Sequence, residues 1–169
     1  GVVFNAETCS FAALKGHLNI LKWLKEYGCP WNVNTCGFAA ENGQKIYADG
    51  FLNSLKIIQR KGYKLAIVSG IRTDIITGMF SITKCPINFD YIYGQDPVLS
   101  KDNNKLLITG LKKYGKIEYI IGDKLSDLEP AKKLKAKSIF VRWGHFTGGE
   151  EQFADYSISN PKELQNIIR

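Results

Sequence analysis

The sequence lacks most of the features that would place it in a membrane, outside the cell or around a zinc ion. No apolar run approaches the ~20 residues of a membrane span, and no basic-then-apolar leader marks the chain for secretion. The four cysteines, Cys9, Cys29, Cys36 and Cys85, form no Cys-x-x-Cys pair, so zinc is not expected. These absences favour a reducing, cytoplasmic compartment.

The 169 residues suit one ordinary domain, or one domain and a fragment. A hydrophobic content of 44% is enough to build a core. The chain begins at Gly1 rather than Met, which indicates a trimmed chain or a piece of a longer one.

The formal charge of +7 is unevenly distributed. Residues 1–44 hold three Lys and three acidic residues, whereas residues 45–169 hold 20 Lys and Arg against 13 Asp and Glu. A basic half attracts phosphorylated ligands or nucleic acid. The lysines are scattered along expected helices, which favours a solvated face over a nucleic-acid partner. Six of them are Lys112, Lys113, Lys116, Lys132, Lys133 and Lys135.

The first 44 residues repeat themselves with an offset of 27 residues. The recurring pairs are Gly1 and Gly28, Thr8-Cys9 and Thr35-Cys36, Phe11-Ala12-Ala13 and Phe38-Ala39-Ala40, and Gly16 and Gly43. Fixed self-similarity indicates stacked units. Within one unit, we expect Thr8 to cap a helix that runs through Leu14 and ends at Gly16. A second helix is expected over residues 17–27.

Residues 16–24 and 38–44 resemble the helices of short ankyrin repeats that contain Cys-Pro-Trp. The resemblance covers about one and a half units, fewer than the three that a solenoid usually needs. It implies a possible protein partner for these helices. It also implies that they pack on the second half, or that the chain belongs to something longer.

After residue 44, expected helices alternate with short apolar strands, which predicts an α/β fold with a parallel sheet. The expected helices are 51–61, 73–82, 101–114, 125–134 and one from Pro161, and the expected strands are 64–69, 89–93, 118–121, 138–141 and 156–158. Strands 65–68 and 119–121 are apolar throughout, as strands buried on both faces are.

Polar side chains stand at three places that the topology brings to one edge of the sheet. Ser69 ends a strand, Lys101 opens a helix, and Asp123 follows a strand with Asp127 four residues later. The carboxyl ends of parallel strands converge on one crevice. A hydroxyl and a cation suit phosphate oxygens, and paired carboxylates suit Mg²⁺. The pattern predicts a site for a small phosphorylated molecule.

Residues 47–169 resemble the haloacid dehalogenase-like superfamily, near its phosphoglycolate-phosphatase-like members. Tyr63-Lys64-Leu65-Ala66-Ile67-Val68-Ser69-Gly70 resembles the second motif of that family, and Gly122-Asp123-x-x-x-Asp127 resembles the fourth. The resemblance makes Ser69 the phosphate-binding hydroxyl and Lys101, or else Lys105, the lysine that steadies the phosphoryl group. Asp123 and Asp127 become ligands of Mg²⁺. The implied fold is a Rossmann-like, doubly wound parallel sheet.

The sequence departs from this family at the first motif, because it contains no Asp-x-Asp. In the family the first Asp attacks phosphorus and the second is the general acid and base. Asn5 and Glu7 follow Val2-Val3-Phe4, but they also match Asn32 and Asn34 of the repeat. The other stand-in, Tyr47 with Asp49, keeps one acid, and we expect Asp49 to be a helix N-cap.

The missing motif also removes the strand that is central in the family, which would leave unpaired strand edges. Val2–Phe4 is the evident candidate within the chain to fill that position, with the repeat helices where the family has a small helical cap.

The sequence thus predicts a helical repeat segment over residues 1–44 and an α/β domain over residues 45–169. The expected function is Mg²⁺-dependent phosphomonoester hydrolysis, impaired or lost without the nucleophile. Two alternatives stay open: an interaction protein on a degenerate scaffold, and a fusion or fragment without a selected function. The substrate is not identified, because residues of the cap select it.

Overall fold

The computed structural model describes residues 5–30, 32, 34–35, 38, 47–94, 108, 110–144 and 146–169. The chain divides into two compact units. The first comprises Gly1–Tyr47 and Thr73–Pro86, and the second comprises Ala48–Arg72 and Ile87–Arg169. Several sequence predictions concern residues outside the described ranges: the Val2–Phe4 strand, the roles of Lys101 and Lys105, most of the expected helix 101–114, and most of the ankyrin-like stretch 38–44.

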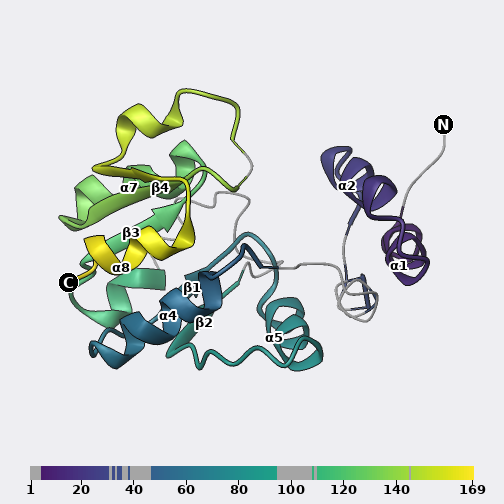
Figure 1. Cartoon of the computed structure of the whole chain (residues 1–169), viewed down its shortest axis with the longest axis horizontal. Helices are drawn as coiled ribbons and strands as arrows, with labels where there is room; N and C mark the ends of the chain where they lie inside the picture. The colour runs from purple at the N-terminus through teal and green to yellow at the C-terminus, as the bar shows by residue number, and fades with distance from the viewer. Residues whose placement is uncertain are drawn as a thin grey trace. The chain divides into compact units, whose positions relative to one another are not determined.

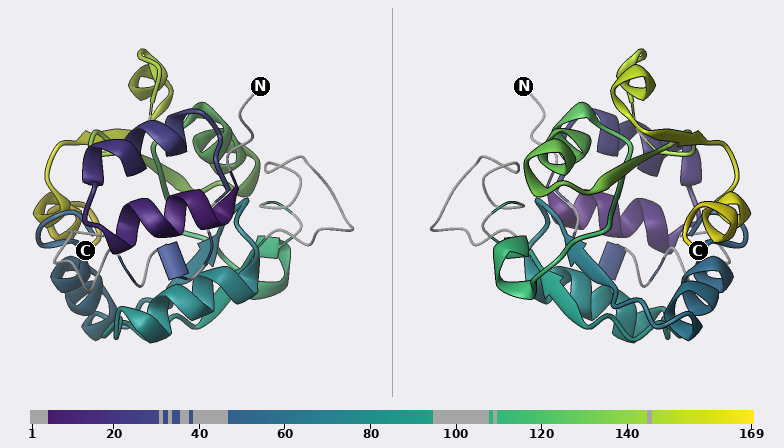
Figure 2. Two further views of the ribbon diagram at one scale, coloured as in Figure 1. Left: turned by 90° about the vertical axis from the view of Figure 1, so that its right-hand side faces the viewer. Right: turned by 90° about the vertical axis from the view of Figure 1, so that its left-hand side faces the viewer.

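The first unit contains the helices α1 (Ala6–Leu14), α2 (Leu18–Glu26) and α5 (Thr73–Ile82). α1 and α2 are joined by a tight turn and pack as an antiparallel pair (Figure 2). Their apolar faces enclose a core of Cys9, Ala12, Ala13, Leu21, Leu24 and Cys29. The helix pair is therefore held together by small and aliphatic side chains.

The start of α1 differs from the prediction, which placed the cap at Thr8. The N-cap is Asn5, whose Oδ1 accepts hydrogen bonds from the backbone N–H and the hydroxyl of Thr8, both at 3.0 Å. Asn is among the most favourable N-cap residues, so the helix begins earlier. The end of α1 is as predicted: Gly16 has a φ of 70°, and its N–H donates to the Ala13 carbonyl at 3.0 Å.

The second unit alternates helices with short strands, which confirms the α/β prediction (Figure 1). Its strands are β1 (Ala66–Val68), β2 (Tyr91–Tyr93), β3 (Tyr119–Gly122), β4 (Lys137–Val141) and β5 (Tyr156–Ile158). Its helices are α4 (Phe51–Arg60), α7 (Leu125–Leu134) and α8 (Leu164–Ile167), with 3₁₀ turns η1 (Lys112–Tyr114), η2 (Glu150–Phe153) and η3 (Pro161–Glu163).

All strand pairs in the described residues are parallel, and they form two sheets. One sheet pairs β1 with β2, and Ser69 N–H extends the ladder to the Tyr93 carbonyl at 2.9 Å. The other has the order β3-β4-β5. The sequence predicts one continuous sheet, whereas β1 and β3 each end a separate sheet among these strands.

The two sheets share no backbone pairing in the part of the chain that the structure describes, and buried apolar side chains connect them instead. One buried cluster contains Leu111, Ile120, Ala131 and Ala136. Ile120 belongs to β3 and Ala131 to α7, whereas Leu111 precedes η1 and Ala136 follows α7. Val68 of β1 packs against this cluster. The end of β1 is thereby placed beside the core that supports β3. Ile121 of β3, by contrast, is 36% exposed.

Two further sequence predictions concern polar residues of this unit, the scattered lysines and Asp49. The six scattered lysines named from the sequence are all exposed, as predicted for a solvated face. The expectation that Asp49 caps α4 is wrong, because the N-cap is Gly50, with a φ of 81°. Glycine adopts this left-handed conformation without the steric cost that a Cβ brings, so it can occupy the bend before α4.

Candidate functional site

Two carboxylates lie where β3 passes into α7. Asp123 directly follows the last residue of β3, and Asp127 lies in the first turn of α7. Asp127 Oδ2 accepts a hydrogen bond from the backbone N–H of Lys124 at 3.3 Å. A carboxylate in the first turn of a helix is stabilised by the helix dipole and by N–H groups without helical partners.

The two carboxylates lie close enough to influence each other's protonation. Burial raises the pKa of Asp127, the negative charge of Asp123 raises it further, and a hydrogen bond with Asp123 adds to the effect. Backbone N–H groups of Lys124 and Asp123 oppose the rise. The Asp127 pKa remains raised in balance, so bringing both negative charges to this turn costs free energy that a cation would offset.

Two glycines allow the carboxylates to occupy these positions. A Cβ at Gly122 would overlap the Cβ of Asp127, and a Cβ at Gly144 would overlap the Cβ and the carboxylate of Asp123. Gly122 ends β3, whereas Gly144 lies in the turn that follows β4. The side chain of Asp127 therefore packs on the backbone at the end of β3, and that of Asp123 packs on the backbone of the turn after β4. The contact between Gly144 and Asp123 is not predictable from the sequence, because the two residues follow different strands.

Ser69 lies at the carboxyl end of β1, as predicted. Its backbone N–H continues the ladder to β2, and its Oγ accepts a hydrogen bond from the Ile71 N–H at 3.1 Å. The side chain is half-buried. Because a hydroxyl both donates and accepts, its proton can still bind a phosphate oxygen.

The structure thus brings Asp123 and Asp127 together and places Ser69 at the end of a strand whose Val68 packs on the Ile120 cluster. In the described part of the chain, no group of three or more His, Cys, Asp and Glu side chains could hold a metal. Two carboxylates fit Mg²⁺, because Mg²⁺ binds one or two protein carboxylates and keeps waters and phosphate oxygens as its other ligands.

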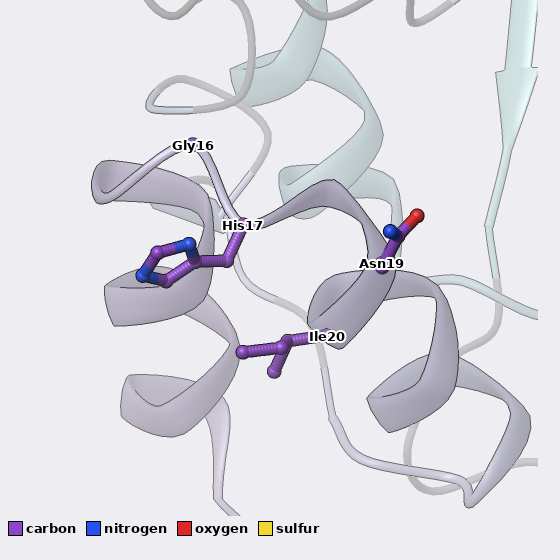
Figure 3. A pocket seen from close by; sticks show the side chains of 4 residues that line it. All are labelled: Gly16, His17, Asn19 and Ile20. Atoms are coloured by element: carbon purple, nitrogen blue, oxygen red, sulfur yellow. The ribbon is translucent and has the colours of Figure 1, made fainter.

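A hollow of about 380 Å³ lies at the turn between α1 and α2. It is lined by Gly16, His17, Asn19 and Ile20. Figure 3 shows the side chains of His17 and Ile20 on one side, whereas Asn19 points away. Ligand sites normally combine an enclosed surface with convergent polar groups. The four residues that line the hollow lack this convergence, so we assign no ligand site to it.

Searching the described helices for a segment long and apolar enough to cross a membrane finds none. Cys9, Cys29 and Cys85 are free thiols.

Comparison with known proteins identifies the family of this chain. The family model for haloacid dehalogenase-like hydrolases matches residues 39–141. The phosphoglycolate phosphatase of Aquifex aeolicus (strain VF5) is 26% identical over 119 residues, which cover 68% of this chain and 55% of that protein. The chain therefore spans about half the length of the curated relative that it matches.

Solved structures show the same fold. A candidate phosphatase of Clostridium difficile has a TM-score of 0.68 at 16% identity, and the match covers 97% of this chain and 92% of that one. A haloacid dehalogenase-type hydrolase of Bacillus subtilis, solved bound to magnesium, has a TM-score of 0.59 at 18% identity, with coverage of 86% and 66%. Identities this low show fold alone. The family model, which matches more than half of the chain, shows that this chain belongs to the haloacid dehalogenase-like hydrolase family.

Proposed function

We propose that the chain binds Mg²⁺ and a small phosphate monoester at the carboxyl ends of β1 and β3, and that its hydrolytic step is impaired or lost. The observation that carries this proposal is the Asp123–Asp127 pair, in which the pKa of Asp127 is raised by burial and by the second carboxylate. Such a pair is better matched to a bound divalent cation than to water alone.

Each residue has a separate role in this proposal. Asp123 and Asp127 hold Mg²⁺, which neutralises charge on a phosphate when bound. The Ser69 hydroxyl donates to a phosphate oxygen while it accepts from the Ile71 N–H. Lys101, outside the described residues, adds positive charge for the phosphoryl group, with Lys105 as the alternative.

The proposed loss of hydrolysis follows from the missing nucleophile. The sequence contains no Asp-x-Asp, and a neutral amide cannot replace an attacking carboxylate. The Asn5 side chain caps α1 through two hydrogen bonds from Thr8. The Tyr47 hydroxyl lies 3.1 Å from the Thr83 hydroxyl. Both stand-ins therefore have structural tasks, which supports a binding protein derived from a phosphatase.

A second candidate function is protein recognition by an ankyrin-like segment over residues 1–44, separate from a catalytic-type domain over residues 45–169. It is supported by a capping arrangement that recurs at the repeat offset: Asn5 accepts from Thr8, and Asn32 accepts from Thr35. This function does not require a nucleophile. The two candidates are compatible, because they use different parts of the chain.

Hydrolysis of p-nitrophenyl phosphate and binding of Mg²⁺ test the first proposal together. We expect calorimetry to detect Mg²⁺ binding by the unmodified chain and none by Asp123→Asn. We also expect the unmodified chain to hydrolyse p-nitrophenyl phosphate no faster than Asp123→Asn does. Mg²⁺-dependent turnover that disappears in Asp123→Asn would show that a nucleophile exists, and Asp49 would be mutated next. Absence of Mg²⁺ binding by the folded chain would contradict the site itself.

A further inference from the structure

The first unit shows one local arrangement twice, and the two copies differ in what covers them. In the first copy, Asn5 Oδ1 accepts from Thr8 N–H and Thr8 Oγ1–H at 3.0 Å each. In the second copy, Asn32 Oδ1 accepts from Thr35 N–H at 2.9 Å and from Thr35 Oγ1–H at 3.1 Å. The sequence offset of 27 residues is thus preserved in hydrogen-bond geometry.

The second copy is covered by α1. Ser10 Oγ lies 2.9 Å from Asn32 Oδ1 and 3.0 Å from Thr35 Oγ1, and Thr35 is fully buried. Phe38 packs against the core between α1 and α2. The Ser10 hydroxyl of the first copy therefore contacts the Asn-Thr pair of the second copy. The core between α1 and α2 likewise receives the phenylalanine of the second copy.

The equivalent group in the first copy is Asn5, Thr8 and Phe11, which we call the open face. Asn5 is exposed and Phe11 is 64% exposed. The open face thus repeats the geometry of Asn32, Thr35 and Phe38, but no other part of the described chain covers it in a comparable way. In the described residues, the Phe11 ring is therefore available for a contact of the kind that Phe38 makes.

We propose that the open face docks one further helix pair of the same 27-residue design. The docked pair supplies a helix hydroxyl to Asn5 Oδ1 and Thr8 Oγ1, and its small and aliphatic core receives the Phe11 ring. The contact continues the interface that α1 already makes with the Asn32–Phe38 segment. Units of this type bury their faces on neighbours in register.

A second copy of this chain is a poorer occupant. Two open faces brought together would offer Asn5 Oδ1 no helix hydroxyl like Ser10, and would set phenylalanine against phenylalanine instead of against an apolar core. The complementary surface, with Ser10 and the core between α1 and α2, is already occupied by the chain's own Thr35 and Phe38. A head-to-tail contact between copies would therefore have to displace these residues. This inference concerns the helical unit and does not depend on the Mg²⁺ site.

The test inserts an extra copy of residues 5–31 between Phe4 and Asn5 of the full chain. Amide hydrogen exchange is then followed in the original α1. Burial of a phenylalanine ring is sufficient to slow local opening by about tenfold or more, so we expect that change in the extended chain. Two matched controls should lose most of it: Phe11→Ala in the original α1, and Ser10→Ala in the inserted copy.

Three results would overturn the proposal. One is unchanged exchange in the original α1 while the inserted copy is protected. Another is an inserted copy that stays unprotected, because docking on the open face would order it. The third is α1 exchange in the unmodified chain that slows with protein concentration and loses this dependence in Phe11→Ala, because the occupant would then be a second copy.

Discussion

The backbone of Gly144 lies directly against the side chain of Asp123, so that any Cβ at position 144 would overlap the carboxylate. The turn after β4 therefore helps to fix where the first acid of the pair stands. Residues that orient a metal ligand without binding the metal commonly change its affinity about 10- to 100-fold when they are mutated.

Gly144→Ala should weaken Mg²⁺ binding about 10- to 100-fold, because the new methyl group displaces the Asp123 carboxylate. Calorimetric titration with Mg²⁺ measures the change. Gly110→Ala is the matched control, since its Cβ would meet the Tyr93 ring at 2.9 Å rather than a carboxylate. Adding Asp123→Gly, which removes the overlapped side chain, should restore stability lost in Gly144→Ala. Equal Mg²⁺ affinity in Gly144→Ala and the unmodified chain would contradict the positioning role.

Mg²⁺ should stabilise the chain through Asp127. At a free Mg²⁺ concentration about 100 times the dissociation constant, binding adds about 2.7 kcal/mol to the free energy of unfolding. Asp127→Asn should abolish that gain. Thermal unfolding with and without Mg²⁺ provides the measurement. Asp155→Asn is the control, because the Asp155 carboxylate accepts hydrogen bonds from Lys137 and Ser138 and lies outside the proposed metal site. This variant should keep the response to Mg²⁺. A response that survives Asp127→Asn would place the metal elsewhere.

The same carboxylate predicts a direction of pH dependence. Because the Asp127 pKa is raised on folding, the folded state holds the proton more tightly than the unfolded state. Its contribution to stability should therefore fall as pH rises from the ordinary Asp pKa of 3.8 through the raised pKa. Without Mg²⁺, Asp127→Asn should remove this decline, as urea unfolding at a series of pH values can show. A decline of the same size in the variant would assign it to other groups.

Asp155 should produce the opposite dependence. It accepts from Lys137 Nζ at 2.8 Å and from Ser138 N and Oγ at 2.9 Å each, and its pKa is lowered to about 2, mainly by the Lys137 hydrogen bond. Its contribution is present above the unfolded pKa of about 3.8 and is lost as pH falls towards 2. After allowance for solvent screening, Asp155→Asn should cost about 1 kcal/mol at pH 7 and little at pH 2, as measured by urea unfolding. A pH-independent cost would argue that shape rather than charge matters there.

Cys9 should be chemically inert in the folded chain. It is fully buried, and its pKa is raised to about 12 by burial first and then by a hydrogen bond and charge interaction with Cys29. Because the thiolate is the reactive species, alkylation at pH 8 should be at least about a hundredfold slower than in the urea-unfolded chain. Peptide mapping after iodoacetamide treatment locates the label, with the partly exposed Cys85 as the internal reference. Equal labelling of Cys9 and Cys85 would contradict this.

Local patterns predict the elements of this chain well. α5 and α7 have the predicted bounds, Thr73–Ile82 and Leu125–Leu134, and the Gly122-Asp123 turn lies at a strand end as expected. These features depend on neighbouring residues, such as the acids of a first helical turn. The expected strand 64–69 shortens to Ala66–Val68, because a strand also requires a partner, and among the described strands β1 pairs with β2 alone.

Other features depend on contacts that no local pattern contains. The overlap that would follow from a side chain at Gly144 involves Asp123, a residue in a different strand-end turn. The repeat pattern predicts a cap at Thr8, whereas Thr8 donates its N–H and hydroxyl to the cap residue Asn5. The division between the β1-β2 and β3-β4-β5 sheets likewise becomes visible only from pairing in space.

That division changes what determines the spacing between Ser69 and the carboxylate pair. Backbone ladders fix distances through directional bonds, but in the described residues β1 and β3 share no such ladder. The contact from Val68 to the Ile120 cluster is apolar and non-directional instead. Hydrophobic packing weakens on cooling. The alignment of Ser69 with the carboxylate pair, the two halves of the proposed phosphate site, should therefore be held less firmly in the cold.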